Sequence, residues 1–226
     1  MWSRSEVKQK GKSNFKKNYW RAVLVAIIYN LFFVASTTAT RSSSGDQDMS
    51  ELFGSPDAVK IALAILAAAS VVLIIIKIID IFLLNPLEVG CNGFFLSNQD
   101  DNATLGELFC AYKNNYGKAV LGIFLRDLLI AIGFALFIIP GVILTYSYRM
   151  VPYILAEDPS VSGSDALKQS RMMMKGMKWK SFVYDLSFIL WGLLSLITCG
   201  LVGVFYVLPY KHSSDAALYQ AIKSER

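Results

Sequence analysis

The feature that most restricts the fold is a long apolar run from Ile61 to Leu84, interrupted only by Lys77 and Asp80. A helix needs about 20 apolar residues to cross the hydrocarbon core of a bilayer. A soluble core helix of this length would carry a polar stripe, and the first half of the run has none. Charged residues make up 17% of the chain, below the roughly 25% of an average soluble domain. We therefore predict an all-α integral membrane protein.

The net charge of +5 could indicate a nucleic-acid-binding protein, but the positive residues lie beside the apolar runs. They concentrate in the N-terminal arm and between Lys168 and Lys180. Basic clusters in such positions set membrane topology and contact anionic lipid. We expect the lipid bilayer and its anionic head groups as partners, and no nucleic acid.

The cysteines and the single histidine do not indicate a metal or cofactor site. Cys91, Cys110 and Cys199 form no C-x-x-C pair, so we expect neither a disulfide framework nor a zinc site. His212 stands alone near the C-terminus, and we expect it on the surface or at the membrane interface. Motifs of soluble enzymes such as G-x-x-x-x-G-K-[ST] are absent. No cofactor is expected.

Residues 1–18 predict a basic amphipathic helix at the membrane interface. Ser3 and Glu6 have the spacing of a capping box, in which each side chain bonds the backbone N–H of the other. Val7, Gly11 and Phe15 recur every four residues and form a narrow apolar edge on a lysine-rich helix. Such a helix suits the surface of an anionic leaflet, and it also fits a solvated positive flank.

Two membrane spans are predicted within residues 19–84. Trp20–Ser36 could also belong to a cleaved signal peptide, but the basic region before it is long, and we favour a retained span. The polar segment Arg41–Asp57 has few positive residues and is predicted to be the only sizeable external loop. The second span, Val59–Leu84, carries the small-xxx-small pair Ala64 and Ala68, which permits close helix contact.

Residues 85–118 predict two short interfacial helices. Asn85-Pro86 can cap and begin a helix, and the segment PLEVGCNGFFL is too short to span a membrane. Thr104 and Glu107 again have capping-box spacing. A third interfacial helix is expected at Ser164–Met174. Its predicted lipid-facing side consists of Ala166, Leu167, Ser170, Met173 and Met174.

The segment after Ala119 decides the number of spans. A single crossing there would place the basic segment 149–180 opposite the N-terminal arm, against the positive-inside rule. A tight turn at Pro140-Gly141 instead gives two spans, residues 119–139 and 142–156, because proline ends a helix and glycine tolerates the turn. A similar hairpin is predicted around Cys199-Gly200, with limbs 181–198 and 201–210.

The two hairpins indicate an internal duplication. Asp127 precedes Gly141 by about the spacing that separates Asp185 from Gly200. We expect about six spans in the cell membrane, with both termini in the cytoplasm. The expected organisation is a single integral membrane domain, 1–226, made of an interfacial helix (1–18), two spans (19–84), interfacial helices (85–118) and two helical hairpins (119–226).

Five segments carry a resemblance to a known family: MWSRSEVKQKGKSNFKKNYWRAVL, NPLEVGCNGFF, ATLGELF, SYRMVPYILAEDP, and the MMKGMKW–DLSF run with its later VLPY. Together they resemble a bacterial multi-pass membrane family common in Firmicutes, known as domain of unknown function 975. The chain is more distantly similar to the membrane domain fused to some glycerophosphodiester phosphodiesterases, which carries no catalytic residues. The resemblance implies a fold and a location, and no activity.

The candidate site is a layer of ionisable residues within the predicted spans, because a charge inside a membrane is costly and usually has a partner or a function. At a rise of 1.5 Å per residue, each lies on the order of 10 Å from the cytoplasmic end of its helix. Lys77 and Asp80 are three residues apart on one helix and can pair locally. Arg126 and Asp127 are adjacent in sequence, point in different directions and should need partners on other helices. The layer consists of Lys77, Asp80, Arg126, Asp127, Arg149 and Asp185.

Three functions follow from this layer. Paired charges that set helix order would make the protein a non-enzymatic membrane module, which contacts lipid, partner proteins of the cell envelope or further copies of itself. A polar cavity open to the cytoplasm would make it a small transporter or lipid-handling protein. An intramembrane enzyme is least supported, because the layer holds no histidine and no metal-ligand spacing.

An aromatic belt is expected from Tyr146, Tyr148, Tyr153, Tyr206 and Tyr210.

Overall fold

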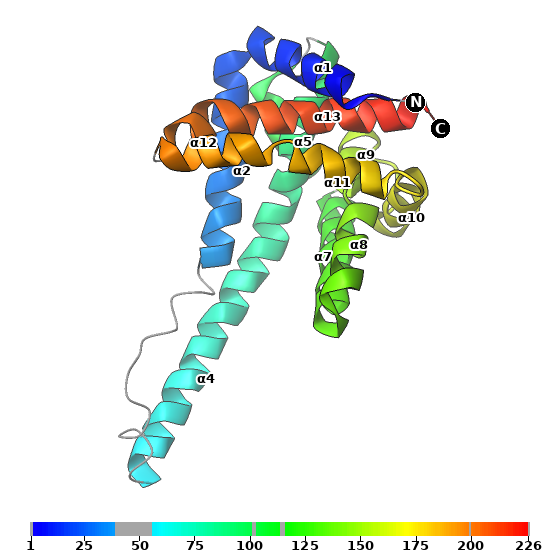
Figure 1. Ribbon diagram of the computed structural model, residues 1–226. Helices are drawn as coiled ribbons and strands as arrows, with labels where there is room; N and C mark the ends of the chain where they lie inside the picture. Colours follow the sequence, from blue (N-terminus) through cyan, green and yellow to red (C-terminus); the bar gives the residue numbers. More distant parts are fainter. Residues whose placement is uncertain (1, 39–55, 101–102, 114–115, 199, 226) are drawn as a thin grey trace. The chain divides into compact units, whose positions relative to one another are not determined.

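The computed structural model describes residues 2–38, 56–100, 103–113, 116–198 and 200–225, and these contain helices and no strand (Figure 1). The predicted all-α class is confirmed for this part of the chain. The chain divides into unit 1, Met1–Tyr29 with Asn85–Arg226, and unit 2, Asn30–Leu84. The expected external loop Arg41–Asp57 lies almost wholly outside the described residues.

The α-helices are α1 (Arg4–Lys17), α2 (Tyr19–Thr38), α4 (Pro56–Ile79), α5 (Asn85–Ser97), α6 (Cys110–Lys113), α7 (Tyr116–Leu136), α8 (Ile138–Ser147), α9 (Val151–Glu157), α10 (Gly163–Met173), α11 (Lys178–Leu186), α12 (Ile189–Ile197) and α13 (Leu208–Ser224). Two 3₁₀ turns, η2 (Asn98–Asp100) and η3 (Leu105–Phe109), and two π turns, η1 (Asp80–Leu84) and η4 (Gly203–Val207), join them. Each π turn ends two residues before a proline, Pro86 or Pro209, whose nitrogen cannot donate to the preceding turn.

Four helical runs of the described residues are long and apolar enough to cross a membrane: Leu63–Asp100, Tyr116–Leu136, Ile138–Glu157 and Lys178–Ile197. The predicted first span, Trp20–Ser36, lies within α2. In unit 2, α4 keeps its apolar side chains exposed, with Leu66 at 65% and Ile74 at 59%. Exposure of apolar surface to water costs about 25 cal/mol per Å². The exposed apolar surface of α4 is therefore compatible with a lipid environment.

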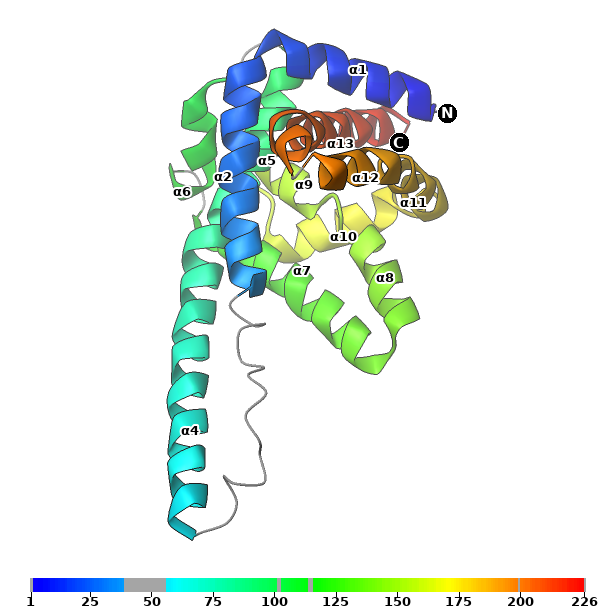
Figure 2. The same ribbon diagram turned by 60° about the vertical axis from the view of Figure 1, so that its left-hand side comes forward.

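Helix α5 lies at the centre of unit 1, against α7, α9, α13 and η3 (Figure 2). The side chains of Val89, Phe94 and Phe95 are at most 1% exposed. Gly90 permits the close contact with η3, because a Cβ there would lie 2.0 Å from the carbonyl oxygen of Leu108. A short helix therefore forms where one was predicted, and protein covers its apolar side chains. The segment is the core helix of unit 1, because other helices cover it on several sides.

The segment after Thr104 also differs from its prediction. It forms the 3₁₀ turn η3, and the side chain of Thr104 makes no capping hydrogen bond. The carboxylate of Glu107 instead accepts a hydrogen bond from the hydroxyl of Ser97 on α5, at 3.1 Å. The predicted capping box is therefore wrong, because packing against α5 gives Glu107 another partner.

Helix α1 packs along α13 (Figures 1 and 2). The predicted capping box is confirmed, since Ser3 and Glu6 bond each other's backbone N–H at 3.2 Å. The apolar edge of α1 faces protein, with Val7 and Phe15 at most 3% exposed. A Cβ on Gly11 would lie 2.5 Å from the Cα of Ser214. The edge that was expected to contact lipid therefore contacts α13, while the lysine-rich face stays outward.

A buried amide network links α1 to two distant segments of unit 1. The amide of Asn14 donates to Gln99 at 2.6 Å, and that of Asn98 donates to the carbonyl of Asn14 at 2.9 Å. Gln99 donates in turn to the carbonyl of Ser213 on α13, at 3.1 Å. These side chains are at most 6% exposed, so each bond satisfies a group that water does not reach.

Helices α7 and α8 form the predicted hairpin, although its turn lies elsewhere. Phe137 is extended, with φ −159° and ψ 153°, and it reverses the chain. Pro140 and Gly141 belong to the first turns of α8, where a missing N–H is tolerated. Gly133 and Gly141 let the limbs meet, because a Cβ on Gly133 would lie 3.1 Å from the Cα of Gly141. The predicted turn position is thus wrong by a few residues.

Helix α10 forms where the third interfacial helix was predicted, but its apolar side faces protein. Ala166, Ser170 and Met174 are fully buried, and Leu167 is 8% exposed. The partners are α7 and α9. The expected lipid-facing side is therefore wrong, because a helix of unit 1 occupies the position that lipid was expected to take.

Helices α11 and α12 precede a turn at Gly200, whose φ of +84° favours glycine as predicted. Cys199 lies outside the described residues. The return limb was expected to end near Tyr210, but it continues through η4 and α13 to Ser224. Within unit 1, α11–α12 runs beside α13 and crosswise to α7–α8 (Figure 1). The two hairpins therefore differ in surroundings and direction, and the predicted duplication is not established.

Candidate functional site

The predicted layer of charges falls into three groups. Lys77 and Asp80 pair within unit 2 at 3.0 Å, as predicted from their spacing. Arg126 and Asp127 join Glu88 in a three-charge cluster of unit 1. Arg149 and Asp185 join Lys211 and Asp215 in a four-charge cluster of the same unit. Two of the three groups therefore contain residues that the predicted layer did not include.

Arg149 belongs to the four-charge cluster because the helix breaks around it. Helix α8 ends at Ser147, and α9 begins at Val151 with Pro152 in its first turn. Proline cannot donate to the preceding turn, so a continuous helix would lose a hydrogen bond there. The fully buried hydroxyl of Ser170 bridges the break: it accepts from the N–H of Met150 at 3.2 Å and donates to the carbonyl of Ser147 at 2.9 Å.

Within the four-charge cluster, each charged side chain pairs with two side chains of opposite charge. Arg149 forms two bonds to Asp185, at 2.7 and 3.0 Å, and one to Asp215 at 2.9 Å. Lys211 lies 2.9 Å from Asp185 and 2.6 Å from Asp215. Each cation therefore contacts both carboxylates, and the formal charges cancel. Fork-shaped bonds of this kind hold a carboxylate in one orientation as well as stabilising its charge.

Two tyrosine hydroxyls complete the cluster. Tyr146 donates to Asp185 at 3.1 Å, and Tyr184 donates to Asp215 at 3.0 Å. Burial opposes ionisation of Asp215, but the charges of Lys211 and Arg149 outweigh it and hold the pKa of that carboxyl below its ordinary value. The cluster thereby ties the α8–α9 break, α11 and α13 together.

The three-charge cluster lies between α5 and α7. Arg126 forms a two-bond contact with Glu88, at 2.5 and 2.9 Å. Its Nε also donates to the neighbouring Asp127 at 2.8 Å. The prediction that Arg126 and Asp127 could not easily pair was wrong, because the long arginine side chain folds back beside its own backbone. The Asp127 side chain is 52% exposed, whereas those of Arg126 and Glu88 are 12% and 14% exposed.

The side chain of His212 lies among aromatic rings of unit 1 and is partly exposed. Its ring stacks on that of Phe95 at 5.2 Å and meets that of Tyr29 edge-on at 4.6 Å. Burial lowers the pKa of His212 to about 4, against an opposing effect of Asp215. The imidazole is therefore neutral at pH 7. Among the described residues, no group of three or more His, Cys, Asp or Glu side chains is placed to hold a metal ion.

Sequence reasoning missed Glu88, Lys211, Asp215 and the two tyrosine hydroxyls. The i,i+4 spacing of Lys211 and Asp215 was a usable signal, because such pairs face each other on a helix. It was overlooked because the last span was expected to end at Tyr210. Glu88 lies in the segment PLEVGCNGFFL, which was expected to form an interfacial helix, and only the packing of α5 against α7 brings it to Arg126.

The fold and the two clusters define an all-helical protein, in its described part, whose longest helices are apolar enough to cross a membrane. Residues 59–226 match the family described as "Protein of unknown function (DUF975)", and the chain belongs to that family. The match begins after α2, so it does not extend to the N-terminal segment that contributed to the resemblance. No curated protein and no solved structure gives a significant match to the chain.

Proposed function

We propose that the protein is a non-enzymatic module of the bacterial cell membrane that acts through contacts with lipid or with partner proteins of the envelope. Three exposed apolar surfaces support this proposal. One follows α4, one is the tip of the α7–α8 hairpin, and one lies on α12. Their side chains include Ile74, Ile138 and Leu190, at 59%, 75% and 75% exposure. A surface of this kind is stable in lipid or against a partner.

The observation that carries the non-enzymatic part is the internal pairing of the four-charge cluster. Arg149 and Lys211 each contact both Asp185 and Asp215, and the formal charges cancel. The four paired charges leave no formal net charge in the cluster, which favours a structural role over a site for a charged ligand. The cluster instead resembles a clasp, since it links the α8–α9 break to α11 and α13.

The proposed topology follows from helix directions within unit 1. Helices α11–α12 run crosswise to the α7–α8 hairpin, so the two cannot both stand upright in one flat bilayer (Figure 1). We place the α7–α8 hairpin across the membrane and α11–α12 along its cytoplasmic face. This proposal departs from the six spans expected from the sequence, because the second hairpin does not cross. The α7–α8 hairpin returns to its starting side in both arrangements, so both termini are cytoplasmic, in agreement with the positive residues between 149 and 180.

Photo-crosslinking in membranes tests the proposed contacts. A diazirine side chain is placed at Ile74 or Leu190, which are exposed, and at Ile123, which is fully buried, as the matched control. The exposed positions should crosslink to phospholipid or to a second protein, and the buried position only within the chain. Insertion of the photogenerated carbene into water at the exposed positions, without crosslinks to lipid or protein, would contradict the proposal.

A further inference from the structure

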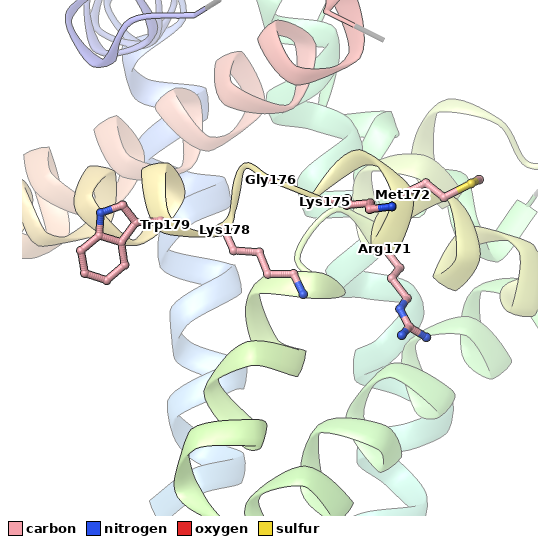
Figure 3. Close-up of a pocket in the computed structure, with 6 residues that line it drawn as sticks. All are labelled: Arg171, Met172, Lys175, Gly176, Lys178 and Trp179. Atoms are coloured by element: carbon pink, nitrogen blue, oxygen red, sulfur yellow. The ribbon is translucent and has the colours of Figure 1, made fainter.

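The elbow between α10 and α11 forms a basic pocket on unit 1, which we call the elbow pocket. Its volume is about 570 Å³ (Figure 3). Three of its side chains are cationic, and one is an exposed tryptophan. The pocket is lined by Arg171, Met172, Lys175, Gly176, Lys178 and Trp179.

The sequence builds this elbow from a buried anchor and a glycine. Met174 follows α10 and is fully buried, which holds the end of that helix against unit 1. Gly176 then takes φ +81°, a conformation that other residues rarely adopt, and α11 begins at Lys178. The reversal brings Arg171, on the last turn of α10, to the same pocket as Lys178.

The side chains of the pocket combine charge with apolar surface. Arg171 and Lys178 both point to the side of the elbow on which the α7–α8 hairpin extends (Figure 3). Trp179 is 73% exposed and stacks on Phe182 at 5.3 Å, and Met172 is 60% exposed. Tryptophan at a membrane surface lies at the level of the head groups, and cations beside it attract anionic lipid.

The elbow pocket and the N-terminal helix differ in what accompanies their positive charge. The apolar edge of α1 is buried against α13, so α1 offers lipid its lysines without an apolar neighbour on that edge. At the elbow, the cations share a pocket with exposed Trp179 and Met172, whose side chains point to opposite sides of it (Figure 3). Lys180 lies two residues after Lys178, and its ammonium group is 6.0 Å from the centre of the Trp2 ring.

We propose that the elbow pocket binds the head group of an anionic phospholipid. Arg171 and Lys178 contact the phosphate, since guanidinium forms paired bonds to phosphate oxygens and an ammonium acts as a point charge. Trp179 and Met172 contact the upper part of the acyl chains. The inference rests on the proposed function as a membrane module, and it names the lipid class that the module recognises.

Native mass spectrometry of the full chain in detergent, titrated with dioleoyl phosphatidylglycerol, measures this binding. The double substitution Arg171→Gln with Lys178→Gln should raise the apparent Kd about 30-fold, because each basic residue near an anionic surface contributes about 5-fold to the affinity. Lys12→Gln with Lys16→Gln removes two charges from the exposed face of α1 and should change it less than about twofold. Gly176→Ala retains every charge, and no atom lies within 4 Å of the added Cβ. It should nevertheless weaken binding, because it strains the backbone that shapes the pocket.

The remaining arms separate the alternatives. Dioleoyl phosphatidylcholine should bind more weakly than phosphatidylglycerol, and glycerol phosphate should not displace the lipid. Equal losses in the two glutamine pairs would overturn the pocket in favour of diffuse charge attraction, and displacement by glycerol phosphate would assign it to a soluble anion. Each glutamine pair must first be recovered in the membrane fraction with an unchanged melting temperature, and Gly176→Ala must be recovered there as a folded chain. Absence of the wild-type chain from that fraction would contradict the proposed function and not the pocket.

Discussion

Removing the charge of Asp185 tests whether the four-charge cluster holds the helices together. Its carboxylate accepts bonds from Arg149, Lys211 and Tyr146 at 2.7–3.1 Å. Loss of one partner of a fully buried ion pair costs about 3–5 kcal/mol. The Asp185 side chain is 29% exposed, and both cations keep Asp215, so the cost is smaller. We expect Asp185→Asn to lower the free energy of unfolding by about 2 kcal/mol, or the melting temperature by about 4–8 °C.

A second substitution shows whether the loss comes from unbalanced charge. Asp185→Asn leaves one excess positive charge, and Arg149→Gln in the same molecule removes it, which should restore about 1 kcal/mol. Thermal unfolding of the wild type, both single variants and the double variant, in one detergent, gives the coupling. Asp165→Asn is the matched control, because its 3.3 Å pair with Lys168 is exposed and should matter by less than about 0.5 kcal/mol. Strictly additive losses, or an Asp185→Asn variant that melts like the wild type, would refute the clasp.

Three further outcomes follow from the structure. Gly11→Ala should destabilise the protein by about 1–3 kcal/mol and expose α1 to protease, because the new Cβ would overlap the backbone of Ser214. Gly117→Ala is the control: no atom lies within 4 Å of its added Cβ, so it should not change stability. Burial lowers the pKa of His212 to about 4, so the unfolded chain binds its proton more tightly. Stability should therefore be complete above about pH 6.5 and fall by about 2–3 kcal/mol towards pH 4, and His212→Phe should remove that slope in melts across this pH range. Thr198→Cys, in a chain without native cysteines, should resist an impermeant thiol reagent outside intact cells; labelling there would support six spans.

Local patterns predicted the parts of the structure that depend on neighbours in sequence. The capping box of Ser3 and Glu6, the Lys77–Asp80 pair and the glycine turn at Gly200 all formed. Each rests on backbone geometry or on spacing along one helix, so no distant residue is needed to specify it. Arg149 and Asp185 were both expected in the charge layer, and the structure shows that they pair with each other.

Several errors arose where an apolar face could contact either lipid or protein. The edge of α1, the faces of α5 and the buried side of α10 have compositions that suit either partner, and in each case protein covers the face. Periodicity reports that a face is apolar and does not report what covers it. Glu88 was misplaced for the same reason, since its role depends on α5 lying in the core of unit 1.

The sequence by itself determined that this chain is helical and that its helices are apolar enough for a membrane, because both properties are carried by runs of consecutive residues. Tertiary structure alone decided which charges on different helices meet. Arg149, Asp185 and Asp215 are separated by 30 residues or more along the chain, and only the break at Pro152 and the continuation of α13 bring them within 3 Å. Pairing between helices depends on where each helix begins, ends and packs, and those quantities follow from contacts that no single segment contains.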